Sequence, residues 1–364
     1  MAVVPCHVGL VVGWLLGLGG MGAQPTSAQV DRTIRVAAVQ MRLRMFTSEE
    51  DYATTIHRWV GRAVERKVDL VVFPEDVGLP LMLLDKSRIG EETTRPTSKT
   101  ATTAPGIATA MRAINTLLRE HRPEILPMVK RHRMPILEAL SVRLARRAEP
   151  IYRRVFADAA RRGEVIVAAG SCPVVKLDGA RPRVYNAGYV FDAAGRLLAT
   201  TLKVNPIPLE RSLLSISPAT HHVPPVFDTP AGRLGLAICY DCYFPDLIAQ
   251  MGRRGMQILV DPRADPTRWT EVQERISKEK GLWQRVQENV CYGIECFGVG
   301  GLVGISFEGR TQIIAPTALT RDGTGILARA RSVDSEELIV ANLDLAALNR
   351  LRRSRSVRQP AAAP

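Results

Sequence analysis

Apolar residues near the start of the chain follow two different periods. Ile34–Gln40 (IRVAAVQ) and Asp69–Phe73 (DLVVF) are compact apolar runs with the length of short buried strands. Between them, in Asp51–Lys67, apolar residues recur every three or four positions, which is the spacing of one face of a helix. The pattern therefore predicts a strand–helix–strand unit that ends where the chain turns at Pro74 and Glu75.

The segment from Leu79 to Arg162 has the pattern of a helical region with one loop. Glu91–Pro105 is polar and rich in threonine, so we expect a loop there. Three helices are predicted after it, and four prolines are expected to interrupt or cap them. The predicted helices are Ala108–His121, Glu124–Arg147 and Pro150–Arg162, and the prolines are Pro123, Pro127, Pro135 and Pro150.

Strand patterns return after residue 164 and alternate with helices. Gly195, shortly after Asp192, indicates a tight turn between two of the strands. The predicted strands are Val165–Gly170, Val184–Phe191, Leu197–Lys203, Leu234–Cys239, Ile258–Val260, Gly298–Ile305, Thr311–Ala315 and Glu337–Leu343, and the predicted helices are Phe244–Gly252, Thr267–Val290 and Leu345–Arg353. Helices that alternate with strands, with hairpins among them, predict an α/β fold with mixed sheets. We expect one domain over about 33–350, with a helical insertion at about 85–162.

The flanking segments differ from this domain. Val8–Gly22 is apolar but short and rich in glycine, and Thr26-Ser27-Ala28 resembles a cleavage site, so residues 1–32 are expected to be a signal peptide or membrane tether. We therefore expect an exported or tethered protein. A wrongly assigned start would give the same pattern in a cytoplasmic protein, since no Lys or Arg precedes the apolar run. Residues 351–364 form a basic tail.

The composition is that of a globular protein, with 46% hydrophobic and 23% charged residues. The net charge of +13 is concentrated in two places. Residues 112–162 hold 13 Lys and Arg against 5 Asp and Glu, and residues 350–364 hold 5 Arg and no acid. Only 5% of residues are aromatic and no nucleic-acid motif accompanies the charge, so we expect no nucleic-acid partner. Solvated basic surfaces and association with an anionic membrane both stay open.

Three residues at the ends of predicted strands could carry chemistry. Cys239 ends an apolar strand before a helix, where a thiol projects from the sheet near backbone N–H groups. Glu75 follows another strand, where partial burial would suit a carboxyl to proton transfer. Lys203 follows a third, and Glu210 could pair with it. Taken singly, each also fits a structural role: a buried apolar thiol, a helix cap and a solvated lysine.

Together these segments resemble the nitrilase, or carbon–nitrogen hydrolase, superfamily. The resemblance rests on FPE with Glu75, on K-x6-E with Lys203 and Glu210, and on ICYDxxFPD with Cys239, in the order Glu, Lys, Cys. AAVQ in the first strand, RVQEN from Arg285 and LDLAALNRLR near the end support it, so it covers about 34–353. It implies a four-layer α-β-β-α sandwich and a homodimer or higher homo-oligomer.

The resemblance also implies a chemistry. Cys239 would attack an amide, carbamoyl or nitrile carbon and form a thioester, Glu75 would shuttle protons, and Lys203 with the backbone N–H of Tyr240 would stabilise the oxyanion. Glu210 would position Lys203. No metal or organic cofactor is implied. The sequence departs from the family's usual pattern after Glu75 (DVGLPLML) and after Val260 (DPRADPTRW), so the substrate class is not predicted.

Two alternatives remain at this point. Cys239 and Cys242 with Cys291 and Cys296 could form a four-thiolate zinc site, or a redox pair. The chain could also be a membrane-associated acyltransferase-like or non-catalytic member of the same superfamily. Because the helical insertion leaves the chain directly after Glu75, we expect it over the mouth of the pocket, as a lid or as an added interface.

Overall fold

The computed structural model describes residues 32–84 and 104–358. The strands are β1 (Thr33–Leu43), β2 (Leu70–Val72), β3 (Ile166–Asp178), β4 (Arg181–Phe191), β5 (Leu197–Leu202), β6 (Val226–Thr229), β7 (Gly232–Leu236), β8 (Ile258–Arg263), β9 (Tyr292–Leu302), β10 (Ile305–Phe307), β11 (Gln312–Ile314), β12 (Ile326–Arg329) and β13 (Glu337–Asp344). The predicted N-terminal signal region lies outside the described residues, as does the loop at 91–105 apart from residues 104 and 105.

The helices are α1 (Glu49–Val64), α3 (Ala104–Glu120), α4 (Arg122–His132), α5 (Ile136–Gly163), α6 (Pro208–Leu214), α7 (Pro245–Arg253), α8 (Glu271–Lys280), α9 (Leu282–Asn289) and α10 (Leu345–Arg358), with short 3₁₀ turns η1 (Leu79–Leu83), η2 (Cys239–Tyr243) and η3 (Thr317–Leu319). Within the described ranges, no helix combines the length and the apolar character needed to span a bilayer.

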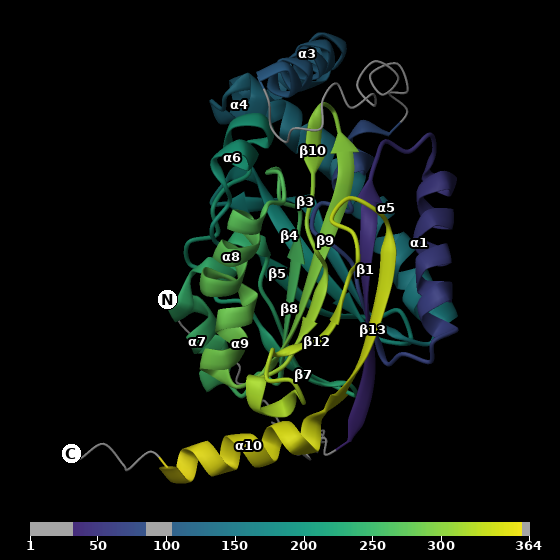
Figure 1. Cartoon of the computed structure of the whole chain (residues 1–364). Coiled ribbons are helices and arrows are strands. Elements are labelled where there is room, and N and C mark those ends of the chain that lie inside the picture. Colours follow the sequence, from purple (N-terminus) through teal and green to yellow (C-terminus); the bar gives the residue numbers. More distant parts are fainter. Residues whose placement is uncertain (1–31, 85–103, 359–364) are drawn as a thin grey trace, which may run out of the picture.

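The strands form two halves of one sheet, which are joined where the end of β1 pairs with β9 (Figure 1). One half has the order β5-β4-β3-β2-β1-β13 and the other β6-β7-β8-β9-β11-β12, and β1 pairs with β9 where Met41 lies opposite Gly298. The runs β1-β2-β3 and β7-β8-β9 are parallel, whereas the outer pairs are antiparallel. The predicted mixed sheet is therefore confirmed.

Three apolar clusters show that the fold has four layers. Ile34, Val36 and Ala38 of β1 pack with Leu236, Val260 and Ile294 of the opposite half, so one core lies between the sheets. A second core lies under α1, α3, α4 and α5 on the outer face of the first half, and a third under α7 and α9 on the outer face of the second. This arrangement confirms the α-β-β-α sandwich.

Two predicted helix boundaries were wrong. Pro127 and Pro150 do not interrupt a helix: α4 continues through Pro127 and α5 through Pro150, and the break falls between Arg133 and Pro135. Burial of Ala148 and Tyr152 on both sides of Pro150 offsets the backbone hydrogen bond lost there, which typically costs about 3 kcal/mol. The helix predicted over 267–290 is instead divided at Gly281, where the backbone is extended between α8 and α9.

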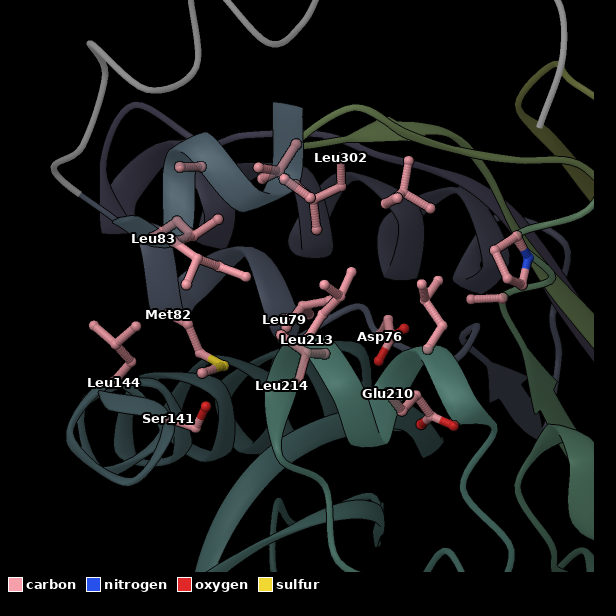
Figure 2. A pocket seen from close by; sticks show the side chains of 18 of the residues that line it. Asp76, Leu79, Met82, Leu83, Ser141, Leu144, Glu210, Leu213, Leu214 and Leu302 are labelled. Atoms are coloured by element: carbon pink, nitrogen blue, oxygen red, sulfur yellow. The ribbon is translucent and has the colours of Figure 1, made fainter. Parts of the chain in front are cut away.

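The strand directions bring several chain ends to one edge of the sandwich. Strands β2, β7 and β8 end at the same edge because their halves are joined through the parallel pair β1 and β9. Strand β5 ends there too, since it is antiparallel to β4, which is antiparallel to β3. A cavity at this edge is lined by residues from η1, α3, α5, α6 and the β9–β10 turn (Figure 2). The carboxyl ends of parallel strands commonly form ligand sites in α/β proteins.

Candidate active site

Glu75 lies directly after β2 and is buried, with 1% of its surface exposed. Its Oε2 accepts a hydrogen bond of 3.0 Å from the Ala264 N–H, which follows β8. The next residue, Asp76, has a left-handed backbone (φ 59°), and its N–H donates to Ser171 Oγ at 3.0 Å. The turn after β2 is therefore held by β3 and β8 together, and it fixes where the Glu75 carboxyl lies.

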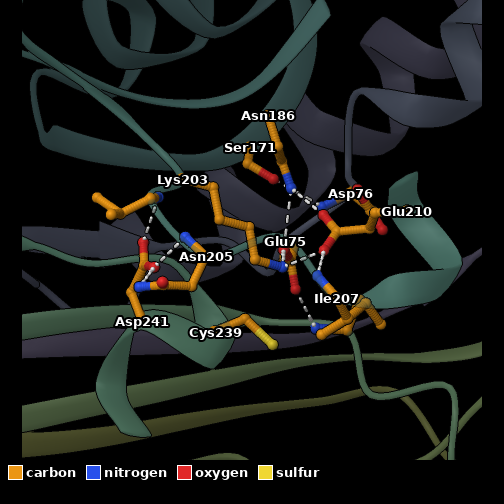
Figure 3. A network of polar contacts seen from close by, with 12 residues as sticks. Glu75, Asp76, Ser171, Asn186, Lys203, Asn205, Ile207, Glu210, Cys239 and Asp241 are labelled. Atoms are coloured by element: carbon orange, nitrogen blue, oxygen red, sulfur yellow. Dashed lines mark hydrogen bonds and ion pairs between the residues drawn. The ribbon is translucent and has the colours of Figure 1, made fainter. Parts of the chain in front are cut away.

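Lys203 follows β5, and its ammonium lies between two carboxylates (Figure 3). Nζ donates to Glu75 Oε1 and to Glu210 Oε2, each at 2.7 Å, and 1% of the side chain is exposed. Glu210 Oε2 also accepts the Ile207 N–H at 2.8 Å at the start of α6. The predicted pairing of Lys203 with Glu210 is confirmed, and Glu75 is a second partner that the sequence did not reveal.

Asn186 of β4 connects the two carboxylates. Its Nδ2 donates to Glu75 Oε1 at 2.9 Å and to Glu210 Oε1 at 3.1 Å. The sequence analysis missed this residue, because VYNAGYVF has the pattern of an ordinary strand. A polar residue in a predicted core strand was the only signal.

Cys239 comes shortly after β7 and begins η2. Its backbone is left-handed (φ 52°), a conformation that is uncommon for residues other than glycine and is often found at functional sites. Its N–H donates to Asp261 Oδ1 of β8 at 2.9 Å. The thiol lies on the Glu75 side of the cluster, close enough to affect the pKa of that carboxyl. The structure thus brings Glu75, Lys203 and Cys239 together from three strand ends, as predicted.

Asp241 fixes the distance between the cysteine turn and the lysine strand. Its carboxylate accepts the N–H groups of Val204 and Asn205 at 3.0 and 2.8 Å, and Asn205 Nδ2 at 3.0 Å. These are the two residues that follow Lys203, so η2 is attached directly to the end of β5. Asp241 belongs to the ICYDxxFPD motif, but its sequence position alone did not indicate this partner.

Tyr240 lies beside the cysteine, at the second position of η2. The first N–H groups of a helical turn have no acceptor within the turn, which agrees with the predicted use of its N–H. Tyr240 is 41% exposed, and its ring contacts the rings of Tyr243 and Phe244. A role for Tyr240 in stabilising an oxyanion stays a prediction.

Burial and neighbouring charge shift the pKa values of the cluster. Burial raises the pKa of Glu75, and Glu210 adds to this effect, while Lys203 opposes it. Burial and the charge of Glu75 raise the pKa of the Cys239 thiol well above its usual value. Burial alone would lower the pKa of Lys203, but the two carboxylates hold it well above its usual value. At neutral pH the cluster therefore holds an ammonium beside a neutral thiol and a carboxyl of raised pKa.

Arg263 is a buried cation that the sequence analysis did not place. Nη1 donates to Glu295 Oε1 at 2.5 Å and Nη2 to the Tyr243 hydroxyl at 3.1 Å. Its guanidinium also lies over the rings of Tyr243 and Phe297. Its charge favours the Cys239 thiolate. The departure DPRADPTRW thus places a paired cation near the cysteine.

The cysteines do not converge on a zinc site. Cys242 and Cys291 pack in the outer core under α7 and α9, whereas Cys296 lies in the core between the sheets. Among residues 32–84 and 104–358, no group of three or more His, Cys, Asp or Glu side chains could hold a metal ion. The four-thiolate alternative is therefore not supported by the donor geometry.

Comparison with solved structures reveals the same fold. Nit3 of Saccharomyces cerevisiae, a member of branch 10 of the nitrilase superfamily, aligns over 90% of this chain and 96% of its own with a TM-score of 0.60 and 19% identity. The amidase from Nesterenkonia sp. AN1, in complex with acrylamide, aligns over 89% and 96% with a TM-score of 0.56 and 18% identity.

Sequence comparison finds distant curated relatives. The "Probable hydrolase YhcX" of Bacillus subtilis (strain 168) is 24% identical over 331 residues, which are 90% of this chain and 53% of that protein. The 2-oxoglutaramate amidase of Paenarthrobacter nicotinovorans is 27% identical over 191 residues, 51% of this chain and 60% of that protein. The chain spans about half the length of the curated relatives it matches.

The family model gives the assignment. The model named carbon-nitrogen hydrolase matches residues 145–353, a range that includes Lys203, Glu210 and Cys239 but not Glu75. Glu75 lies at the same strand edge as the matched residues and contacts Lys203 directly. Because this match covers more than half of the 364 residues, and because the fold and the strand-end cluster agree with it, the chain belongs to the carbon–nitrogen hydrolase family.

Proposed function

We propose that this protein hydrolyses the carbon–nitrogen bond of a small amide, carbamoyl or nitrile substrate through a thioester on Cys239. The observation that carries the proposal is the contact between a buried ammonium and a buried carboxylate beside a strained cysteine. Lys203 Nζ lies 2.7 Å from Glu75 Oε1, and both side chains are about 1–2% exposed. Burying charged groups costs free energy, so their presence here favours a functional role. Clusters of titratable groups with shifted pKa values are common in active sites.

The first step for an amide is proton transfer from the Cys239 thiol to Glu75, coupled to attack of Sγ on the carbonyl carbon. The raised pKa of the thiol means that it needs this base, and the raised pKa of Glu75 brings the base closer to neutrality. A carbon–sulfur bond forms, and the carbonyl π electrons move to oxygen. Lys203 and the Tyr240 N–H would stabilise that oxyanion.

Collapse of the tetrahedral intermediate then breaks the carbon–nitrogen bond. Glu75 returns its proton to the nitrogen, and ammonia leaves. Water next attacks the thioester with Glu75 as base, releases the carboxylic acid and restores the thiol. Glu210 and Asn186 position the reacting groups through their bonds to Lys203 and Glu75.

The test is an ammonia-release screen over aliphatic amides, nitriles and N-carbamoyl compounds with the purified chain. Cys239→Ala and Cys239→Ser should abolish turnover without unfolding the protein. Cys242→Ala is the matched control and should keep most activity, because that thiol packs in the apolar core under α7. Iodoacetamide should inactivate the enzyme by alkylating Cys239. Inactivation through alkylation of Cys242 instead would overturn the assignment of the nucleophile.

A further inference from the structure

The cavity beside the cluster is apolar over most of its wall. Its empty space amounts to about 970 Å³, a volume that includes open solvent at its mouth. The wall is built mainly of aliphatic side chains from four helical elements and one turn. They include Met82 of η1, Ala113 and Leu117 of α3, Leu144 of α5, Leu213 of α6 and Leu302.

The carboxyl groups of the cavity are gathered toward one end, whereas the Ser141 hydroxyl lies at the other end, beside Met82 and Leu144. Asp76 and Glu210 lie on one side in Figure 2, while Met82, Leu83 and Leu144 lie on the opposite side. Glu75 and Lys203 also line the cavity. Cys239 is not among the lining residues, and these two neighbours connect it to the cavity. A ligand that reacts at the cluster can therefore extend from it along an aliphatic wall.

The helical segment after Glu75 supplies much of this wall. Helix α3 packs against α5 and β10, and α5 packs against η1 and α6. The alanines at 110 and 113 present the smallest side chains on the buried face of α3, and they leave room that larger residues would fill. The segment that we expected over the pocket mouth thus forms part of the pocket itself.

The charges of the wall exclude one class of ligand. Among the lining residues that the structure describes, Lys203 is the one cation, and two carboxylates already hold it. An acyl group that ends in a carboxylate would find no free basic partner among these described residues. An uncharged aliphatic chain makes favourable contact with the same surface.

We propose that the cavity binds the aliphatic chain of the acyl group, so that the substrates are long-chain primary amides of fatty acids. This proposal rests on the proposed function, since it places the reacting carbonyl at Cys239, Glu75 and Lys203 and the chain between α3, α5 and α6. Each methylene buried in such a wall should raise kcat/KM about fourfold. Acetamide and butanamide would occupy only the polar end.

The test measures kcat/KM for acetamide, butanamide, octanamide and dodecanamide with the full chain. We expect a rise of about fourfold per methylene until the cavity is filled. Ala113→Phe should lower the ratio of kcat/KM for dodecanamide to that for butanamide at least about tenfold, the effect of losing two methylene contacts. The matched control is Ala108→Phe, since Ala108 lies on the exposed face of the same helix and should leave the ratio unchanged.

A second variant keeps the test meaningful if Ala113→Phe folds poorly. Leu117→Ala enlarges the cavity, so the amide with the highest kcat/KM should have a longer chain. Misfolding cannot produce this effect. Equal kcat/KM for all four amides, with the ratio unaffected by Ala113→Phe, would overturn the acyl-chain proposal and leave the hydrolase proposal standing. If the wild type released no ammonia from any amide, nitrile or carbamoyl compound, the hydrolase proposal would fail. Calorimetric titration of the Cys239→Ala variant with dodecanamide then tests the acyl-chain proposal without catalysis. Binding of dodecanamide would support that proposal, and no binding would overturn it.

Discussion

Lys203 carries a charge that water does not reach. Its ammonium is stabilised by Glu75 and Glu210 at 2.7 Å each, so three charged side chains share one buried site. Removing a single member of such a group leaves an uncompensated charge, which is typically far more harmful than removing an exposed ion pair. The positions of all three are therefore tightly coupled.

Substitution of this lysine tests whether its geometry matters beyond its charge. Lys203→Arg keeps the charge, but the planar guanidinium is larger and cannot place a donor at the same point. We expect kcat/KM to fall on the order of 100-fold or more, the typical effect of losing an oxyanion donor. Lys176→Arg, at an exposed lysine of β3, is the control and should be neutral. Normal kinetics in Lys203→Arg would show that the proposed active-site role of Lys203 is wrong.

The pH dependence of activity should reflect Glu75. Below its pKa Glu75 is protonated and cannot accept the thiol proton, so kcat/KM should fall as pH falls through that pKa. Burial and the negative charge of Glu210 raise this pKa. Glu210→Gln removes the charge and keeps an oxygen acceptor, so the acid limb of the pH profile should move to lower pH. An unchanged limb, or one displaced to higher pH, would contradict the assignment of Glu75 as base.

Sequence reasoning found the three candidate residues of the proposed reaction but not the residues that hold them in place. Glu75, Lys203 and Cys239 each follow an apolar strand, and that position is visible in the sequence. Asn186 and Asp261 lie within strands, and their contacts with Glu75 and Cys239 depend on which strands become neighbours. Local patterns contain no such information, so these partners could be found only in the folded chain.

At the scale of elements, Gly170 controls how closely β3 approaches the turn before Glu75. Its backbone is left-handed (φ 70°), and the pairing of β3 with β4 shifts register between Ala168 and Ser171. A Cβ at this position would lie 1.8 Å from the Pro74 carbonyl oxygen. Only glycine fits this contact without moving the backbone that carries Glu75.

A pair of glycine substitutions isolates that contact. Gly170→Ala and Gly179→Ala both place alanine at a positive φ, which costs about 1–2 kcal/mol, but Gly179 has no atom within 4 Å of the added Cβ. Gly170→Ala should therefore be less stable than Gly179→Ala by a further 1–3 kcal/mol or so, and it should lose activity as Glu75 moves. Urea unfolding and kcat/KM measure the two effects. Equal behaviour of both variants would mean that the β3 contact does not position Glu75.

Element types could be predicted better than element ends. The strands before Glu75, Lys203 and Cys239 and the turn at Gly195 are where the pattern placed them. Strand β9 begins at Tyr292, well before the predicted start at Gly298. The prediction missed this part because its residues are all buried and do not alternate between apolar and polar. Helix α5 passes through Pro150 because packing against the sheet outweighs a local preference.

The whole molecule combines a folded sandwich with an uneven distribution of charge. The described helices α3, α4 and α5 carry most of the basic surplus between residues 112 and 162, and Arg119, Arg131 and Arg146 are exposed. Their apolar faces are already used in the first outer core and in the cavity wall. This packing explains the apolar residues of α3, α4 and α5 without a membrane contact. The exposed arginines are the part of the segment that could still contact anionic lipid. Association with a membrane and assembly into a homo-oligomer both stay predictions.

Vesicle binding tests the remaining part of this hypothesis at the scale of the whole chain. If the basic surface contacts anionic lipid, the protein should sediment with anionic but not neutral vesicles at low salt, and high salt should release it. Arg119, Arg131 and Arg146 changed together to Gln should weaken binding on the order of 100-fold, from about 1 kcal/mol per charge. The matched control changes the exposed Arg253, Arg268 and Arg275 near α7 and α8 in the same way and should bind normally. If the protein did not sediment at low salt, or sedimented equally with both kinds of vesicle, the membrane hypothesis would be wrong. Forming the cavity wall would then be the role of these helices.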